Sequence, residues 1–232
     1  MFDTGDYAWI LMSSALVMFM TPGLAFFYGG MVRSKNILGM LMQNFFCLGL
    51  ISVLWGAIGY TLAFGDAGNG GVIGNFDFAW MDGLVTEAPV GDPSNMLLMV
   101  FQMTFAIITP ALITGAIADR MRFSAWVWFI GLWSILVYSP VAHWVWAGGW
   151  LAELGSHDFA GGAVVHINAG AAALAGAIIL GKRQGWPKTQ MAPHSLPWTM
   201  IGAGILWFGW FGFNAGSAFG ANGLAVQAWT NT

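Results

Sequence analysis

The fold is decided by the stretch Asp158-Phe159-Ala160-Gly161-Gly162-Ala163-Val164-Val165-His166-Ile167-Asn168-Ala169-Gly170. It opens on a carboxylate and places a histidine about two helical turns later, roughly 12 Å along a helix axis. Small residues follow, and the next charge is Lys182. The uncharged run is about twenty residues long, which is the length of a helix that spans a bilayer. The stretch therefore predicts a membrane helix with one ionisable side chain, His166, in its middle.

A histidine in mid-membrane is costly and normally faces a polar path or a partner. His166 could be a core residue bonded to a neighbouring carbonyl, or it could line a pore. A neutral imidazole offers one donor and one acceptor, so a pore histidine could hold a small polar molecule in an apolar tube. Asp158 is predicted to cap this helix, because an Asp at an N-cap accepts backbone N–H groups. It would also add negative potential near an outer site without touching a cation.

Composition places the whole chain in lipid. It is 58% hydrophobic and 7% charged, whereas a soluble domain is about a quarter charged. Long apolar runs without strand alternation favour helices over a barrel. The sequence therefore predicts an all-α, polytopic helical bundle, and the lipid bilayer as its surroundings. About six spans are expected, at residues 7–32, 37–64, 94–118, 123–145, 159–180 and 198–219.

The charges predict the orientation. All seven Lys and Arg residues fall in the loops after the first, third and fifth predicted helices, and nine of the ten carboxylates fall on the other side. The exception is Asp119. By the positive-inside rule the basic loops are cytoplasmic, so the N-terminus is predicted outside. The acidic outer face would concentrate cations near an outer mouth, over a reach of about 10 Å in salt.

Helices 159–180 and 198–219 are rich in small residues. Gly212, Gly216 and Gly220 lie four apart, a pattern that lets helices approach closely. We therefore expect these two helices at the centre of the bundle, away from lipid. Phe213 and Ser217 should share one helix face, because they are also four apart.

Several other functions find no support in the sequence. His143, His157 and His194 lack the clustered spacing of a metal site and receive no role. No Ser-His-Asp order, phosphate loop or zinc-protease motif is present, so no enzyme activity and no cofactor are expected. The charge distribution does not indicate nucleic-acid binding. Trp146, just past the fourth predicted helix, could be an ordinary interfacial tryptophan or part of a site.

Five stretches together resemble the Amt/Mep/Rh ammonium transporter family, and specifically its Amt branch. The first is the stretch from Asp158 to Gly170 quoted above. The others are Thr21-Pro22-Gly23-Leu24-Ala25-Phe26-Phe27-Tyr28-Gly29-Gly30-Met31-Val32-Arg33, Phe101-Gln102-Met103-Thr104-Phe105-Ala106, Ala142-His143-Trp144-Val145-Trp146 and Gly209-Trp210-Phe211-Gly212-Phe213-Asn214-Ala215-Gly216-Ser217. They occur in the family's order and cover nearly the whole chain.

The resemblance implies a role for each matching position. Trp146, Phe105 and Ser217 would form an outer site that recruits ammonium. Phe105 and Phe213 would stack as a gate beneath it, and His166 would be one of two pore histidines. Asp158 would be the buried acid that supports the outer site.

The resemblance also implies an inverted-repeat fold, of which this chain would be the first half. The family has eleven helices in two five-helix repeats and works as a homotrimer. Residues 1–232 would form one partial membrane domain, with the first repeat at 1–196 and the first helix of the second repeat at 197–232. The second pore histidine then has no counterpart here, and the chain resembles a little over half of a transporter.

The sequence thus leads to two hypotheses. The first is ammonium transport across the cell (inner or plasma) membrane: NH4+ is held at the outer aromatic site, loses its proton, and passes as NH3 through an apolar pore containing His166. The second is an ammonium sensor, in which the same membrane domain signals to a cytoplasmic partner. A PII-type cytoplasmic regulator is a further possible partner of the transporter.

Overall fold

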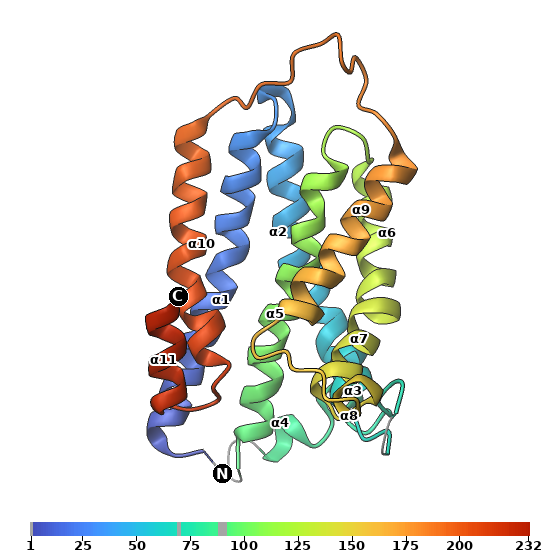
Figure 1. The fold of residues 1–232 in the computed structure, drawn as a ribbon. Helices are drawn as coiled ribbons and strands as arrows, with labels where there is room; N and C mark the ends of the chain where they lie inside the picture. The colour runs from blue at the N-terminus through green and yellow to red at the C-terminus, as the bar shows by residue number, and fades with distance from the viewer. Residues whose placement is uncertain (1, 69–70, 88–91) are drawn as a thin grey trace.

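A computed structural model describes residues 2–68, 71–87 and 92–232. It is helical, and six of its helices are long and apolar enough to cross a membrane. They form a bundle with short helices at one end (Figure 1). The predicted all-α fold with six spans is therefore confirmed for the described residues. Residues 1, 69–70 and 88–91 lie outside them.

The spans follow the chain in order, and three of them contain a π-helical turn. The first, third and sixth spans are α1 (Thr4–Met31), α5 (Ser94–Ile117) and α10 (Leu196–Gly216). The second joins α2 (Ile37–Leu54), the π-helical turn Trp55–Gly59 and α3 (Tyr60–Phe64). The fourth joins α6 (Phe123–Trp133), the π-helical turn Ser134–Tyr138 and α7 (Ser139–Trp146), and the fifth joins the π-helical turn Gly162–Ile167 and α9 (Asn168–Leu180).

Short helices complete the chain. They are the 3₁₀ turns Ser34–Asn36 and Ala79–Met81, and the helices α4 (Leu84–Glu87), α8 (Trp150–Glu153) and α11 (Gly223–Asn231). α11 was not predicted from the sequence. Asn222 caps it by accepting the Ala225 N–H at 3.0 Å, and α11 folds back beside α10 near the acidic end (Figure 1). α10 itself ends at Gly216, three residues before the predicted boundary.

α10 packs along α1 through its glycines. A Cβ added at Gly212 would lie 2.6 Å from the Leu16 Cβ, and one at Gly216 would lie 2.6 Å from the Ser13 Cβ. No real Cβ approaches that closely, so the small residues set the distance between the two helices. The close approach predicted from the glycine spacing is therefore present at Gly212 and Gly216, whereas Gly220 lies beyond the end of α10.

α5, and not α9 or α10, is the central helix among the described residues. In its most apolar stretch 72% of residues are buried, against 17% for the span containing α9 and 22% for α10. The expectation that the fifth and sixth helices lie centrally is wrong for this chain. α9 packs mainly on α5, and its large apolar residues Leu174, Ile178 and Ile179 are more than 60% exposed.

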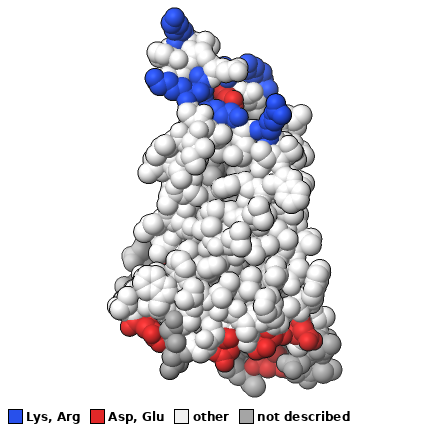
Figure 2. Space-filling view, turned by 90° about the vertical axis from the view of Figure 1, so that its right-hand side faces the viewer, with Lys and Arg blue, Asp and Glu red and all other residues white. Residues whose placement is uncertain are grey.

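Charge separates to the two ends of the bundle. Figure 2 shows Lys and Arg gathered at one end around a small acidic patch, the other Asp and Glu residues in view at the opposite end, and an uncharged belt between them. This distribution, together with the six apolar helices, is that of a multi-pass membrane protein. The two ends are called the basic end and the acidic end below.

Candidate functional site

The fifth span starts with an unusual turn held by Asp158. The Asp158 Oδ1 accepts the N–H groups of Gly161 and Gly162 at 2.6 and 2.8 Å, and its Oδ2 accepts those of Ala163 and Val164 at 2.8 and 2.9 Å. The predicted cap is thus present, and it satisfies four donors that a helix start leaves free. The helix begins at Gly162, three residues later than predicted.

Gly161 explains the late start. Its φ of 148° is accessible to glycine but strained for other residues. A Cβ there would also lie 3.0 Å from the ring of Phe213. The backbone then continues as a π-helical turn, in which the His166 N–H donates to the Gly161 carbonyl at 3.0 Å. Such turns are rare and are frequent at functional sites.

A small cavity, here called the aromatic cavity, lies at the acidic end beside this turn. Its volume is about 130 Å³. Three of its walls are the expected Phe105, Trp146 and Ser217, together with Asp158. The remaining lining residues are Phe64, Gln102, Phe159, Ala160 and Phe219.

Aromatic rings connect the aromatic cavity to His166. The Trp146 and Phe105 rings are perpendicular with centroids 6.0 Å apart. Phe105 and Phe213 follow at 4.4 Å, and Phe213 and His166 at 5.8 Å with nearly parallel planes. Trp210 stacks on His166 at 5.6 Å. Phe105 and Phe213 are at most 2% exposed, so both rings are buried between the cavity and the imidazole.

Two uncharged polar side chains, Ser217 and Gln102, line the aromatic cavity. The Ser217 hydroxyl donates to the Phe213 carbonyl at 2.8 Å, which leaves the lone pairs of its oxygen available. The Oε1 of Gln102 is buried and has no hydrogen-bond partner within the described residues. The Trp146 indole N–H donates to the Asp158 carbonyl at 3.1 Å, and this bond fixes the ring. The cavity can therefore accept hydrogen bonds from a small donor between aromatic faces.

His166 is half-buried and lines a second hollow of about 620 Å³ on the far side of Phe213. Trp210, Phe213 and Asn214 of α10 form one wall of this hollow, and α11 another. The structure thus brings Trp146, Phe105, Phe213 and His166 into one continuous series of rings.

Sequence reasoning did not select Gln102, Phe64, Phe219 or Trp210. Gln102 could have been found, because it is an uncharged amide within an apolar run, three residues before Phe105 and so on a neighbouring face. Phe64, at the end of α3, and Phe219, three residues past α10, also line the cavity, and no local sequence pattern indicates this. Within the described residues there is no group of three His, Cys, Asp or Glu that could hold a metal ion.

These features define a multi-pass α-helical membrane protein with a small aromatic cavity near one membrane surface. The model of the Ammonium Transporter Family matches residues 8–232. The chain therefore belongs to the ammonium transporter family.

Individual relatives support this assignment. An ammonium transporter of Mycobacterium tuberculosis is 52% identical over 256 residues, covering 99% of this chain and 54% of the relative. The crystal structure of Candida albicans Mep2 superposes with a TM-score of 0.87 at 35% identity, covering 99% of this chain and 52% of that one. A structure called Sensor Amt Protein gives 0.88 at 29% identity, covering 98% of this chain and 58% of that one. The chain spans about half the length of the curated relatives it matches.

Proposed function

We propose that this chain forms the ammonium-recruiting part of an ammonium transporter. The observation that carries the proposal is the aromatic cavity, in which Phe105 and Trp146 offer aromatic rings, Ser217 offers an uncharged acceptor and Gln102 adds a polar side chain. Ammonium is a four-fold hydrogen-bond donor and a cation. A desolvated cation over an aromatic face gains about 2 kcal/mol. Rings and acceptors together suit this ion better than either would alone.

Asp158 supports the cavity without binding the ion directly. Both of its oxygens already accept two backbone N–H groups each. Its negative charge nevertheless lies beside the cavity, and no cation pairs with it within the described residues. The carboxylate therefore raises the local concentration of cations through its potential.

Passage beyond Phe105 and Phe213 requires loss of charge. A bare cation in hydrocarbon costs on the order of tens of kcal/mol by Born estimates. The pKa of a lysine ammonium falls from about 10.4 to about 5–6 on full burial, so an ammonium drawn past these rings sheds a proton. NH3 then moves along an apolar path in which His166 donates or accepts one hydrogen bond. Potassium has no proton to lose and stays outside.

The membrane setting and the assembly belong to the same proposal. The basic end faces the cytoplasm and the N-terminus lies outside in the cell (inner or plasma) membrane, which the charge separation supports. Residues 1–196 form a first repeat and 197–232 begin a second. The working form is a homotrimer, with a PII-type protein as a cytoplasmic regulator.

The test is uptake of methylammonium by the full-length protein in cells lacking other ammonium transporters. His166→Ala should lower uptake at least tenfold, and potassium should not inhibit the parent protein strongly. His194→Ala is the matched control, because His194 bonds the Val32 carbonyl at the basic end and should keep normal uptake. Unchanged uptake in His166→Ala would rule out the pore role.

The sensor remains a second candidate, and the likeness to the Sensor Amt Protein structure favours it. In this alternative the aromatic cavity binds ammonium, but the protein conducts poorly and signals to a cytoplasmic partner. Proteoliposomes distinguish the two. Rapid ammonium flux through purified protein supports transport, whereas tight binding with negligible flux supports sensing.

A further inference from the structure

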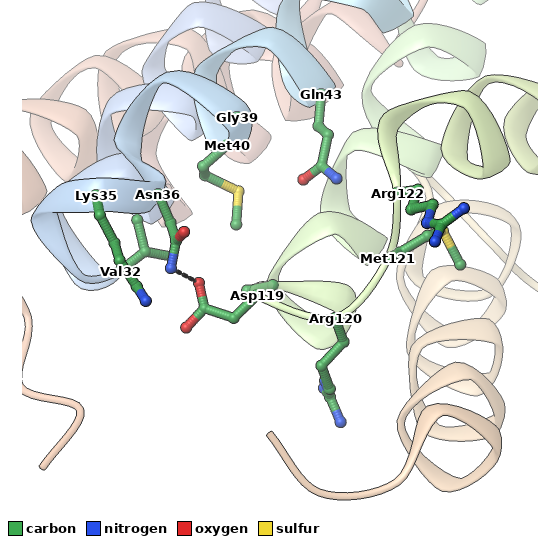
Figure 3. Close-up of a pocket in the computed structure, with 11 residues that line it drawn as sticks. Val32, Lys35, Asn36, Gly39, Met40, Gln43, Asp119, Arg120, Met121 and Arg122 are labelled. Atoms are coloured by element: carbon green, nitrogen blue, oxygen red, sulfur yellow. Dashed lines mark hydrogen bonds between the residues drawn. The ribbon is translucent and has the colours of Figure 1, made fainter. Parts of the chain in front are cut away.

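A hollow at the basic end, here called the basic hollow, is not explained by ammonium transport. Its volume is about 320 Å³, roughly ten times the volume that a water molecule takes in the liquid. It lies between the start of α2 and the loop that joins α5 to α6 (Figure 3). It is lined by Val32, Lys35, Asn36, Gly39, Met40, Gln43, Ala118, Asp119, Arg120, Met121 and Arg122.

The one carboxylate in the basic hollow is already neutralised. The side chain of Asp119 is only 2% exposed, and it pairs with Arg33 at 2.9 Å and with Arg183 at 3.9 Å. The Asn36 amide also donates to it, as the dashed line in Figure 3 shows. Two arginines therefore hold one carboxylate, and Asp119 does not cancel the charge of the other cations.

Three cations of the basic hollow have no anionic partner within the described residues. Lys35 and Arg122 form no salt bridge there, and Figure 3 shows them on opposite sides of the hollow. Arg120 donates to the carbonyls of Gly181 and Ala116, so its charge also remains uncompensated. Such a concentration of unpaired positive charge around a hollow attracts an anion.

Gln43 adds an uncharged donor deeper in the basic hollow. The residue is 7% exposed, and Figure 3 shows its amide pointing from α2 toward Asp119 and Arg120. Its backbone carbonyl accepts from Trp126, but its side-chain amide makes no hydrogen bond within the described residues. Gln43 lines the basic hollow, so its N–H₂ group can donate to a ligand oxygen there.

The basic hollow lies at the end of a predicted membrane span, where lipid phosphates are expected. Its α2 wall, Gly39 to Gln43, belongs to the first two turns of a membrane span. Leu38 and Phe123, next in the chain to two of the lining residues, are 71% and 39% exposed and can contact acyl chains. We propose that the basic hollow binds the phosphate of an anionic phospholipid headgroup, through Lys35, Arg122, Arg120 and the Gln43 amide.

Photo-crosslinking of the full-length protein tests this proposal. The protein is placed in phosphatidylcholine nanodiscs that contain a phosphatidylglycerol analogue with a photoreactive headgroup, and the labelled peptides are mapped. Labelling should fall on residues 35–43 and 118–123. Lys35→Gln and Arg122→Gln should each weaken it about fivefold, and the double variant about 25-fold. Unlabelled phosphatidylglycerol should compete, and phosphatidylcholine should not.

Lys188→Gln is the matched control. It removes one positive charge from the same end of the chain but does not line the basic hollow, so labelling should stay within about twofold of the parent. An equal loss in Lys188→Gln would show general surface attraction and overturn the proposal. Displacement by millimolar inorganic phosphate would assign the site to free phosphate, and labelling confined to other segments would show that something else fills the hollow. Either result also overturns the lipid assignment.

Discussion

Asp158 and Asp119 are two sheltered carboxylates at opposite ends of the bundle, and they are stabilised differently. Asp158 accepts four backbone N–H groups and has no cationic partner within the described residues. Asp119 is paired with Arg33 and Arg183. Amide dipoles stabilise a carboxylate without cancelling its charge, whereas arginines cancel it.

The two ends of the bundle therefore attract ions of opposite charge. The acidic end keeps a negative potential beside the aromatic cavity, which suits an arriving cation. At the basic end two arginines pair with Asp119, and the remaining cations keep a positive potential around the basic hollow. Removing the charge of each carboxylate in turn separates these two roles.

Asp158→Asn should have the largest effect. In Asp158→Asn, an N–H₂ group replaces the Oδ2 that accepts the N–H groups of Ala163 and Val164. About two charge-assisted hydrogen bonds are therefore lost, at about 1.5–3 kcal/mol each. We expect methylammonium uptake by the full-length protein to fall roughly 100-fold. Asp82→Asn, which removes an exposed carboxylate from the same end, should leave uptake nearly unchanged. Normal uptake in Asp158→Asn would mean that neither the cap nor the charge matters for transport.

Asp119→Asn should act on stability instead. It leaves two partly exposed arginines without their shared anion, and we expect a loss of about 2 kcal/mol, less than for a fully buried pair. Thermal unfolding in detergent measures the loss, while uptake by the surviving protein should stay within about twofold. Combining Asp119→Asn with Arg33→Gln should cost less than the sum of the two single changes. Strict additivity would show that the pair at 2.9 Å is not coupled.

Gln102→Leu tests whether Gln102 contributes to ammonium binding in the aromatic cavity. The Gln102 Oε1 has no protein partner within the described residues, so the change should not destabilise the fold. Removal of the polar amide from the cavity lining should weaken ammonium binding about tenfold, in line with about 1–1.5 kcal/mol for one polar contact. The half-saturation concentration for methylammonium measures this, with Met103→Leu as the neighbouring control outside the cavity. An unaltered half-saturation concentration would remove Gln102 from the site.

The smallest effect is expected at Asp92, an exposed carboxylate that links the acidic ends of α1 and α5. The Ser94 hydroxyl and the Tyr7 hydroxyl donate to it at 2.5 and 2.6 Å, and these bonds lower its pKa to about 2. The folded pKa lies below the ordinary value of about 3.9, so the contribution is present above pH 4 and is lost as the pH falls toward about 2. Unfolding midpoints across this range should show a small acid-dependent loss that Asp92→Asn abolishes. The same acid dependence in the variant would point to another group.

Local patterns predicted much of this protein. Apolar runs long enough to span a bilayer predicted the six helices, and basic residues in alternate loops predicted the charge separation. Both signals depend only on the positions of residues along the chain. The cap by Asp158 was also predictable, since a helix start leaves free N–H groups next in the chain. Motif resemblance selected Trp146, Phe105, Phe213 and His166, which the structure places in one series of rings.

Other features depend on distant contacts and were not predictable. α5 is central because the side chains of α1, α2 and α9 meet on it, a relation that the small residues of α9 did not indicate. Gln102 became a site residue only when Ser217 and Trp146 came to lie around the same cavity.

The order of residues along the chain was enough to predict which segments span the membrane and which end carries which charge. The length of each apolar run and the positions of the lysines and arginines can be read directly from the sequence. Only the tertiary structure decided which carboxylate is neutralised, because Arg33, Asp119 and Arg183 come from three different loops. Electrostatic pairing depends on distance in space, and packing of the helices sets that distance.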